Sequence, residues 1–404
     1  MAYWSDLPPE LLDLVATGFD SPSDTRHFRS VCSTWRSSIP QPLTMFFPTI
    51  KFLNPNVHHC DLRLTKHTFF HLSSSSDNDA PGWLTKREEH NPGELHLFNP
   101  FSRTLIKHLA PNLPRKLDLT NIKVRELGSE YVLRNVSNTS NENDNMDYYN
   151  MEHQKVAVTF INSNNNVNDY VFLSTHNTGK LLMYRSKIEA WTFLDDYTLG
   201  YDDRSIFVND WCLHYVDVVE FDGTFYAVTN SGRTVAIKVT DSSLTVTLLK
   251  SSIIGGDKKC LVKVADDLLM VDLYTDMTPR LIKVHGVEIF KLDREEQKWV
   301  LVKNLEHHSI FLSNHSSFSA VGLKGCKGNC IYFHFKNLDN KDSCCSEVKD
   351  EASMDNFEWK SDEVGVFDFE KGFFGRLDEH LKDSQLFSWP PPGWVTSARM
   401  ITSP

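Results

Sequence analysis

Two histidines of this 404-residue chain have a spacing that could hold a metal ion. His67 and His71 are four residues apart, and on a helix both imidazoles would lie on one face, as in a zinc site. The residues between them, Thr68-Phe69-Phe70, are typical of a strand, and the glutamate that assists such histidine pairs is missing. We therefore expect no metal ion at this position.

Cysteines offer a second possible metal site. Four thiols lie near one another in the sequence: Cys326, Cys330, Cys344 and Cys345. Structural zinc usually takes two Cys-x-x-Cys-like knuckles, and an adjacent pair makes a poor knuckle, so free cysteines are favoured. Cys32 lies on an apolar helical stripe and is interpreted as a packed small hydrophobic residue, not a nucleophile.

Signatures of enzyme chemistry are missing from the sequence. It has no phosphate-binding loop of the Gly-x-x-x-x-Gly-Lys type, no Gly-x-Gly-x-x-Gly, no Gly-x-Ser-x-Gly and no His-Glu-x-x-His. We expect no catalytic residues and no cofactor. The proline-rich segment 389–394 could be a ligand for an aromatic groove, but a rigid turn before a closing strand is favoured.

Composition excludes further classes of protein. Against 53 acidic residues stand 42 Lys and Arg, a net charge of −11, which argues against a nucleic-acid partner. No apolar run approaches the roughly 18 residues of a membrane helix, so no membrane partner is expected. Residues 1–6 lack the basic and apolar regions of a secretory signal, and eight scattered cysteines suit a reducing compartment. We expect the nucleus, the cytoplasm, or both.

The elements that must position any site begin with a small helical module. Pro8 and Pro9 suit a first helical turn, where a missing N–H costs little, and Leu11, Leu12 and Val15 form an apolar face behind them. A second helix is predicted after the N-cap Ser21. It has an apolar stripe at i, i+3, i+4 and i+7: Phe28, Val31, Cys32 and Trp35.

From residue 46 onward the pattern changes to short apolar and β-branched runs between polar turns. Predicted strands cover residues 94–99, 180–185, 224–228, 287–292 and 363–369, with following strands at 104–106, 234–237 and 299–302. Repeated units of this kind favour a β-propeller, with a sandwich or barrel as the alternative. The repeat is blurred by predicted loop insertions near 73–82, 138–169 and 339–358; the last holds seven acids and two lysines.

The helical module resembles an F-box. Asp6-Leu7-Pro8, Glu10-Leu11-Leu12 and the run 28–36, which contains Val-Cys-x-x-Trp-Arg, carry the resemblance. The resemblance implies a three-helix module that binds a Skp-type adaptor and, through it, a cullin-RING ligase. Eight residues match family positions of the core and adaptor face: Leu7, Pro8, Leu11, Leu12, Val15, Val31, Cys32 and Trp35. A helical cap packed on the β region is the alternative.

The β region is similar, more diffusely, to that of plant F-box proteins whose C-terminal domain of unknown function is predicted to be propeller-like. Phe98-Asn99-Pro100, Trp211, the segments 218–223 and 290–293, and the ending 391–396 carry this similarity. The sequence departs from the kelch pattern, since Gly255-Gly256 is its single Gly-Gly pair.

We thus predict an α plus all-β multidomain chain, with an F-box over residues 1–45 and a β-propeller-like domain over 46–404. The family implies the substrate-receptor subunit of a Skp–cullin–F-box ubiquitin ligase, with no catalysis of its own and an unknown target protein bound by the β domain. The alternatives are a propeller enzyme or small-molecule sensor, which would place perturbed acids or histidines in the central channel, and a scaffold without a degradation target.

Overall fold

The chain divides into two compact units, Met1–Phe46 and Phe47–Pro404. The computed structural model describes residues 7–16, 28–29, 31–38, 47–52, 60–75, 82–91, 94–103, 122–136, 154–161, 169–194, 214–250, 255–277, 282–335, 364–377 and 386–387. Among these residues, no helix has the length and apolar character needed to cross a membrane.

The first unit is helical. Helix α1 (Pro9–Ala16) begins where the prolines predict, and the backbone N–H groups of Leu11 and Leu12 donate to the Pro8 carbonyl, at 3.0 and 3.2 Å. A shorter helix, α3 (Ser33–Ser38), contacts α1. The described part of this unit holds two α-helices, so the three helices that the F-box resemblance implies are not confirmed.

The second unit is built of β-sheets, here called blades 1 to 5 in chain order. Blade 1 contains β1 (Thr49–Phe52), β2 (Cys60–Ser74), β3 (Trp83–Asn91), β4 (Glu94–Phe98) and β5 (Ile122–Asn135). Blade 2 contains β6 (Val156–Phe160), β7 (Tyr170–Thr175), β8 (Leu181–Arg185) and β9 (Ala190–Leu194), with a short 3₁₀ turn at Ser186–Ile188. Blades 1 and 2 are joined by one pair, Tyr131↔Val156, which makes them formally one sheet.

The other blades are separate sheets. Blade 3 contains β10 (Tyr215–Phe221), β11 (Thr224–Thr229), β12 (Thr234–Val239) and β13 (Leu244–Leu248). Blade 4 contains β14 (Lys258–Val264), β15 (Asp267–Met277), β16 (Ile282–Asp293) and β17 (Lys298–Val302). Blade 5 contains β18 (His308–Ser313), β19 (Ser317–Val321), β20 (Cys330–His334), β21 (Gly365–Asp368) and β22 (Phe373–Arg376), in the order β19-β18-β20-β21-β22.

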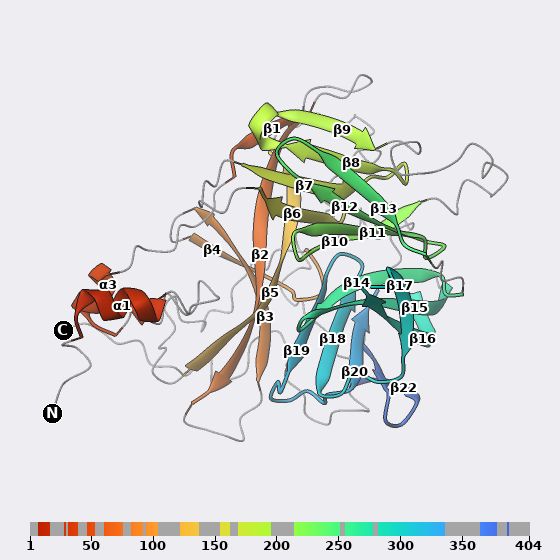
Figure 1. Ribbon diagram of the computed structural model, residues 1–404. Helices are drawn as coiled ribbons and strands as arrows, with labels where there is room; N and C mark the ends of the chain where they lie inside the picture. Colours follow the sequence, from red (N-terminus) through yellow and green to blue (C-terminus); the bar gives the residue numbers. More distant parts are fainter. Residues whose placement is uncertain are drawn as a thin grey trace, which may run out of the picture. The chain divides into compact units, whose positions relative to one another are not determined.

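Five inner strands close a ring. Strand β5 contacts β6, β6 contacts β10, β10 contacts β14, β14 contacts β19, and β19 returns to β5. In Figure 1 the blades follow one another in chain order, from the orange strands of blade 1 to the blue strands of blade 5. The described strands therefore form a five-bladed propeller, a blade number that the sequence did not predict.

Each interface between neighbouring blades has its own apolar core. Val158 and Phe172 of blade 2 pack with Leu133 of blade 1, and Val218 of blade 3 packs with Val171 of blade 2. The three other clusters join blades 3 and 4, blades 4 and 5, and blades 5 and 1. Because each blade buries both faces against its neighbours, its strands read as nearly continuous apolar runs.

Chain order within a blade differs around the ring. In blades 2, 3 and 4 the first strand is innermost and each hairpin adds a strand outward. In blade 1 the innermost strand is instead the last one in the chain. This strand, β5, pairs with β2 along a ladder from Leu62↔Asn135 to Ser74↔Ile122. In blade 5, β20 pairs with β18 in parallel.

Most predicted strands are confirmed. Residues 94–99, 180–185, 224–228, 287–292 and 363–369 contain or lie within β4, β8, β11, β16 and β21, and 234–237 and 299–302 lie in β12 and β17. The predicted insertions differ in part: Ser73 and Ser74 end β2, and β6 lies inside 138–169. Residues 104–106, 339–358 and 389–394 lie outside the described residues.

Candidate functional site

The first unit exposes apolar side chains on one side of α1. Leu11 and Val15 are each 47% exposed and Leu14 is 68% exposed, at positions i, i+3 and i+4 of the helix. Val31 is 54% exposed. Leu11, Leu14 and Val15, here called the exposed apolar face, form a surface of α1 that a partner could cover. Leu14 was missed by the sequence analysis, although its spacing from Leu11 and Val15 could have identified it.

Other residues predicted for the adaptor face lie inside the unit. Leu12 is fully buried. Trp35 is half-buried, and its ring lies 4.5 Å from that of buried Phe28. Leu7 and Cys32 are half-buried and Pro8 is exposed. The predicted set therefore mixes interior residues with surface residues.

A pair of arginines braces the segment around Trp35. Arg36 Nε donates to the Arg29 carbonyl at 3.2 Å, and an Arg29 guanidinium N–H donates to the Arg36 carbonyl at 2.6 Å. Trp35 lies between Arg29 and Arg36 in the sequence, and its ring packs on that of Phe28. We therefore expect a substitution of Trp35 to weaken partner binding mainly by disturbing the fold of the unit.

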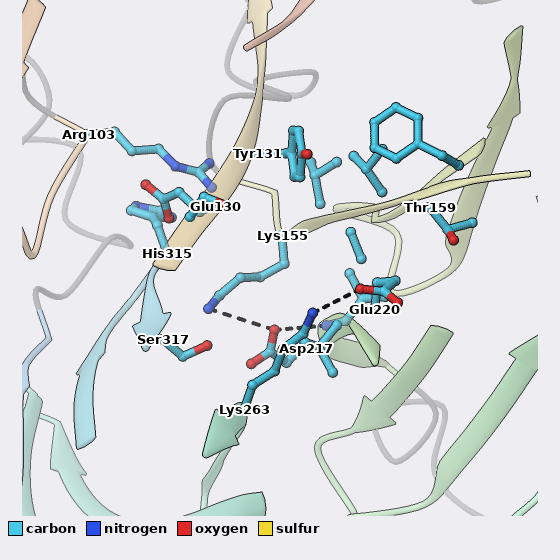
Figure 2. A pocket seen from close by; sticks show the side chains of 17 residues that line it. Arg103, Glu130, Tyr131, Lys155, Thr159, Asp217, Glu220, Lys263, His315 and Ser317 are labelled. Carbon is cyan, nitrogen blue, oxygen red and sulfur yellow. Dashed lines mark hydrogen bonds and ion pairs between the residues drawn. The ribbon is translucent and has the colours of Figure 1, made fainter. Parts of the chain in front are cut away.

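In the second unit, a cavity of about 410 Å³ lies within the ring of inner strands. Residues from all five inner strands line it: Ser129 to Tyr131 of β5, Val156 to Phe160 of β6, Asp217 to Glu220 of β10, Lys263 of β14 and Ser317 of β19. Arg103, Lys155 and His315 complete the lining. Figure 2 shows these charged side chains around the cavity. Its volume lies in the range of ligand pockets.

Asp217 is the most enclosed carboxylate of the cavity. One of its oxygens accepts the Val218 N–H at 2.8 Å and the other accepts the Leu261 N–H at 2.9 Å. Lys155 Nζ is 3.7 Å from the same side chain. Burial raises the pKa of Asp217, while Lys155 and the two N–H groups oppose that shift. Its neighbour Glu220 pairs with Lys263 at 2.9 Å on the more exposed rim.

Glu130, on the other side of the cavity, belongs to a buried ionic network in blade 1. Strand register places His67 directly between Glu88 and Glu130, and its ring nitrogens lie 2.8 and 3.3 Å from their carboxylates. Lys86 Nζ lies 2.9 Å from Glu130, and the Ser316 hydroxyl donates to Glu130 at 2.7 Å. Burial would raise the pKa of Glu130, but Lys86 and His67 hold it well below its usual range.

The candidate metal ligands named from the sequence do not form a cluster of three or more among the described residues. His67 and His71 lie in β2, as the strand interpretation predicts, and His67 is committed to the ionic network. Cys330 is buried in β20, and the Cys326 thiol donates to Ser309 Oγ at 3.4 Å; Cys344 and Cys345 lie outside the described residues. The described residues contain no group of three or more potential ligands suited to a metal ion.

The closed ring of blades and its lined cavity define a β-propeller protein. The chain belongs to the KIB1-4 beta-propeller family, whose model matches residues 52–368. It is 31% identical to F-box protein SKIP23 of Arabidopsis thaliana over 432 aligned positions, which cover 98% of this chain and 96% of that protein.

Two further Arabidopsis thaliana relatives carry the same class of name. F-box protein At2g17036 is 27% identical, covering 98% of this chain and 96% of its own length. F-box protein At2g26160 is 26% identical, covering 82% of this chain and 95% of its own. The resemblance to plant F-box proteins with a propeller domain is thus confirmed.

Proposed function

We propose that this chain is the substrate-receptor subunit of a Skp–cullin–F-box ubiquitin ligase. The observation that carries the proposal is the exposed apolar face of a helical unit in a chain related, over nearly its full length, to F-box proteins. A unit of 46 residues buries little apolar surface by itself, so exposed leucines at helical spacing call for a partner.

The helical unit would form a three-helix F-box and bind a Skp-type adaptor through Leu11, Leu14, Val15 and Val31. Burying such side chains against a partner contributes about 1.5–3 kcal/mol each before ordering costs. Leu12 and Trp35 would instead hold the unit together. The adaptor would connect the chain to a cullin-RING ligase.

The propeller would hold a target protein near the charged conjugating enzyme. In this arrangement the chain performs no bond chemistry, because tethering raises the effective concentration of the target lysine at the enzyme. Ubiquitination in the nucleus or cytoplasm, followed by proteasomal degradation, is the outcome that this role implies.

Adaptor binding by full-length variants tests the proposal. Leu11→Arg places a charge in the exposed apolar face, and we expect its affinity for a purified Skp-type adaptor to fall about thirtyfold or more, as at an interface hot spot. Because Leu11 is half exposed in the free chain, the variant should fold normally.

The matched control is Leu248→Arg, which changes a 38% exposed leucine of β13 in the propeller. It should bind the adaptor like the parent. If the parent does not bind, or if Leu11→Arg binds as tightly as the parent, the receptor assignment or its proposed face is wrong. In the first case a propeller enzyme or sensor becomes the better hypothesis.

A further inference from the structure

Strand β6 has an edge that faces the cavity. It pairs with β7 along its whole length, from Val156↔Ser174 to Phe160↔Tyr170. Its other edge meets β5 at the single pair Tyr131↔Val156. The two faces of β6 are occupied, since Val158 packs between blades 1 and 2 and Ala157 packs between blades 2 and 3. What β6 presents to the cavity is therefore its backbone.

The register identifies the backbone groups on this edge. Ile161 N–H donates to the Asp169 carbonyl at 3.1 Å, and the Lys155 carbonyl accepts the Thr175 N–H at 3.0 Å. In an antiparallel ladder alternate residues bond to one neighbour, so the odd-numbered residues of β6 bond to β7. The N–H and C=O groups of Val158 and Phe160 consequently point away from β7, and within the described residues no hydrogen bond reaches them.

Side chains cap individual backbone groups on the inner strands β10 and β14. Asp217 accepts the N–H groups of Val218 in β10 and Leu261 in β14. Ser317 and Ser319 of β19 donate to the carbonyls of Leu261 and Lys263, each at 2.7 Å. At the β6 edge, the backbone groups of Val158 and Phe160 remain open to a strand from another molecule.

Charge near this edge favours an anion. The Lys155 side chain is 12% exposed and immediately precedes β6, and Figure 2 shows it directed toward Asp217. The carboxylate of Asp217 already accepts two backbone N–H groups. Lys258 also interacts electrostatically with Lys155 and Asp217, and burial lowers the pKa of Lys258. At the far end of β6, Phe160 is 36% exposed and offers an apolar contact.

We propose that an extended acidic peptide segment adds as a strand to the β6 edge, bonds to Val158 and Phe160, and places a carboxylate at Lys155. Such strand addition obtains affinity from main-chain hydrogen bonds and specificity from flanking side chains. That the segment belongs to a ligase target rests on the function proposed above, whereas the binding site itself does not.

The test is panning of a random linear peptide library against the purified full-length chain without adaptor. We expect enriched peptides to carry an acidic residue within a β-forming run. Lys155→Met and Val158→Pro should each weaken their binding about tenfold or more. Proline at 158 removes an N–H that faces the cavity and leaves the bonds to β7 in place.

Matched controls lie elsewhere in the propeller. Lys187→Met removes a surface lysine paired with Asp241. On β13, Leu249 and Ser243 make the bonds toward β12 and its turn, so the N–H of Val246 points away from β12. Val246→Pro removes this outward-facing N–H. Both should leave peptide binding unchanged. Thermal unfolding of all four variants checks that the fold persists.

Three results would overturn the proposal: no enriched peptide, binding that survives either cavity variant, or displacement of the peptide by free succinate at the peptide's own concentration. The last would indicate a site for small carboxylates. Because the adaptor is absent from this experiment, its outcome is separate from the adaptor-binding test, and either can fail without the other.

Discussion

His71 in β2 gives the propeller a predicted sensitivity to acid. The side chain is 5% exposed, and burial, with help from nearby Arg125, lowers its pKa from 6.5 to about 4, against the opposing effect of a hydrogen bond to the Lys324 backbone. Between these values the unfolded chain binds a proton that the folded chain does not. The stability is therefore fully present above pH 6.5 and is lost as the pH falls toward 4, by about 3 kcal/mol at roughly 1.4 kcal/mol per pH unit.

Urea unfolding between pH 4 and 7 measures this contribution. We expect His71→Asn to flatten the pH dependence of the free energy of unfolding, whatever its effect at neutral pH. His285→Asn, at a half-exposed position on β16, is the matched control and should keep the parent's slope. Equal slopes in His71→Asn and the parent would show that His71 does not carry the effect.

Among the elements, the hairpin between β10 and β11 depends on its turn. Asp222 and Gly223 both have positive φ, at 53° and 72°, as in the two-residue turn that matches strand twist. A Cβ at Gly223 would meet no atom within 4 Å, so Gly223→Ala should cost about 1 kcal/mol for its backbone conformation alone. Ser242→Ala, in the turn between β12 and β13, should change stability by less than about 0.5 kcal/mol, and thermal unfolding compares the two variants.

Strands joined by short turns were the part of the fold that the sequence predicted well. Residues 224–228 and 234–237 have β-branched and aromatic runs on either side of Asn-Ser-Gly, and they form β11 and β12. Strand β6 was hidden because Asn-rich segments surround its five residues. The cavity could not be predicted, since Lys155, Asp217 and Glu130 meet only after five blades close, and no local spacing encodes that meeting.

Contact between the first and last blades closes the ring of the propeller. Phe318 of β19 stacks between Phe69 of β2 and Phe311 of β18, with ring centroids 4.2 and 4.8 Å apart. Phe318→Ala should therefore cost about 3–5 kcal/mol in unfolding free energy. Phe373→Ala, at a 53% exposed position on β22, is the control and should cost about 0.5 kcal/mol or less. Equal losses in chemical denaturation would contradict this account of ring closure.

If adaptor binding belongs to the helical unit, the propeller remains available to a target. Amide hydrogen exchange of the full-length chain, with and without a purified Skp-type adaptor, tests this division of roles. We expect slower exchange in α1 and α3 on adaptor addition and unchanged exchange in the propeller strands. Protection in the propeller strands without protection in α1, or no protection anywhere, would contradict it.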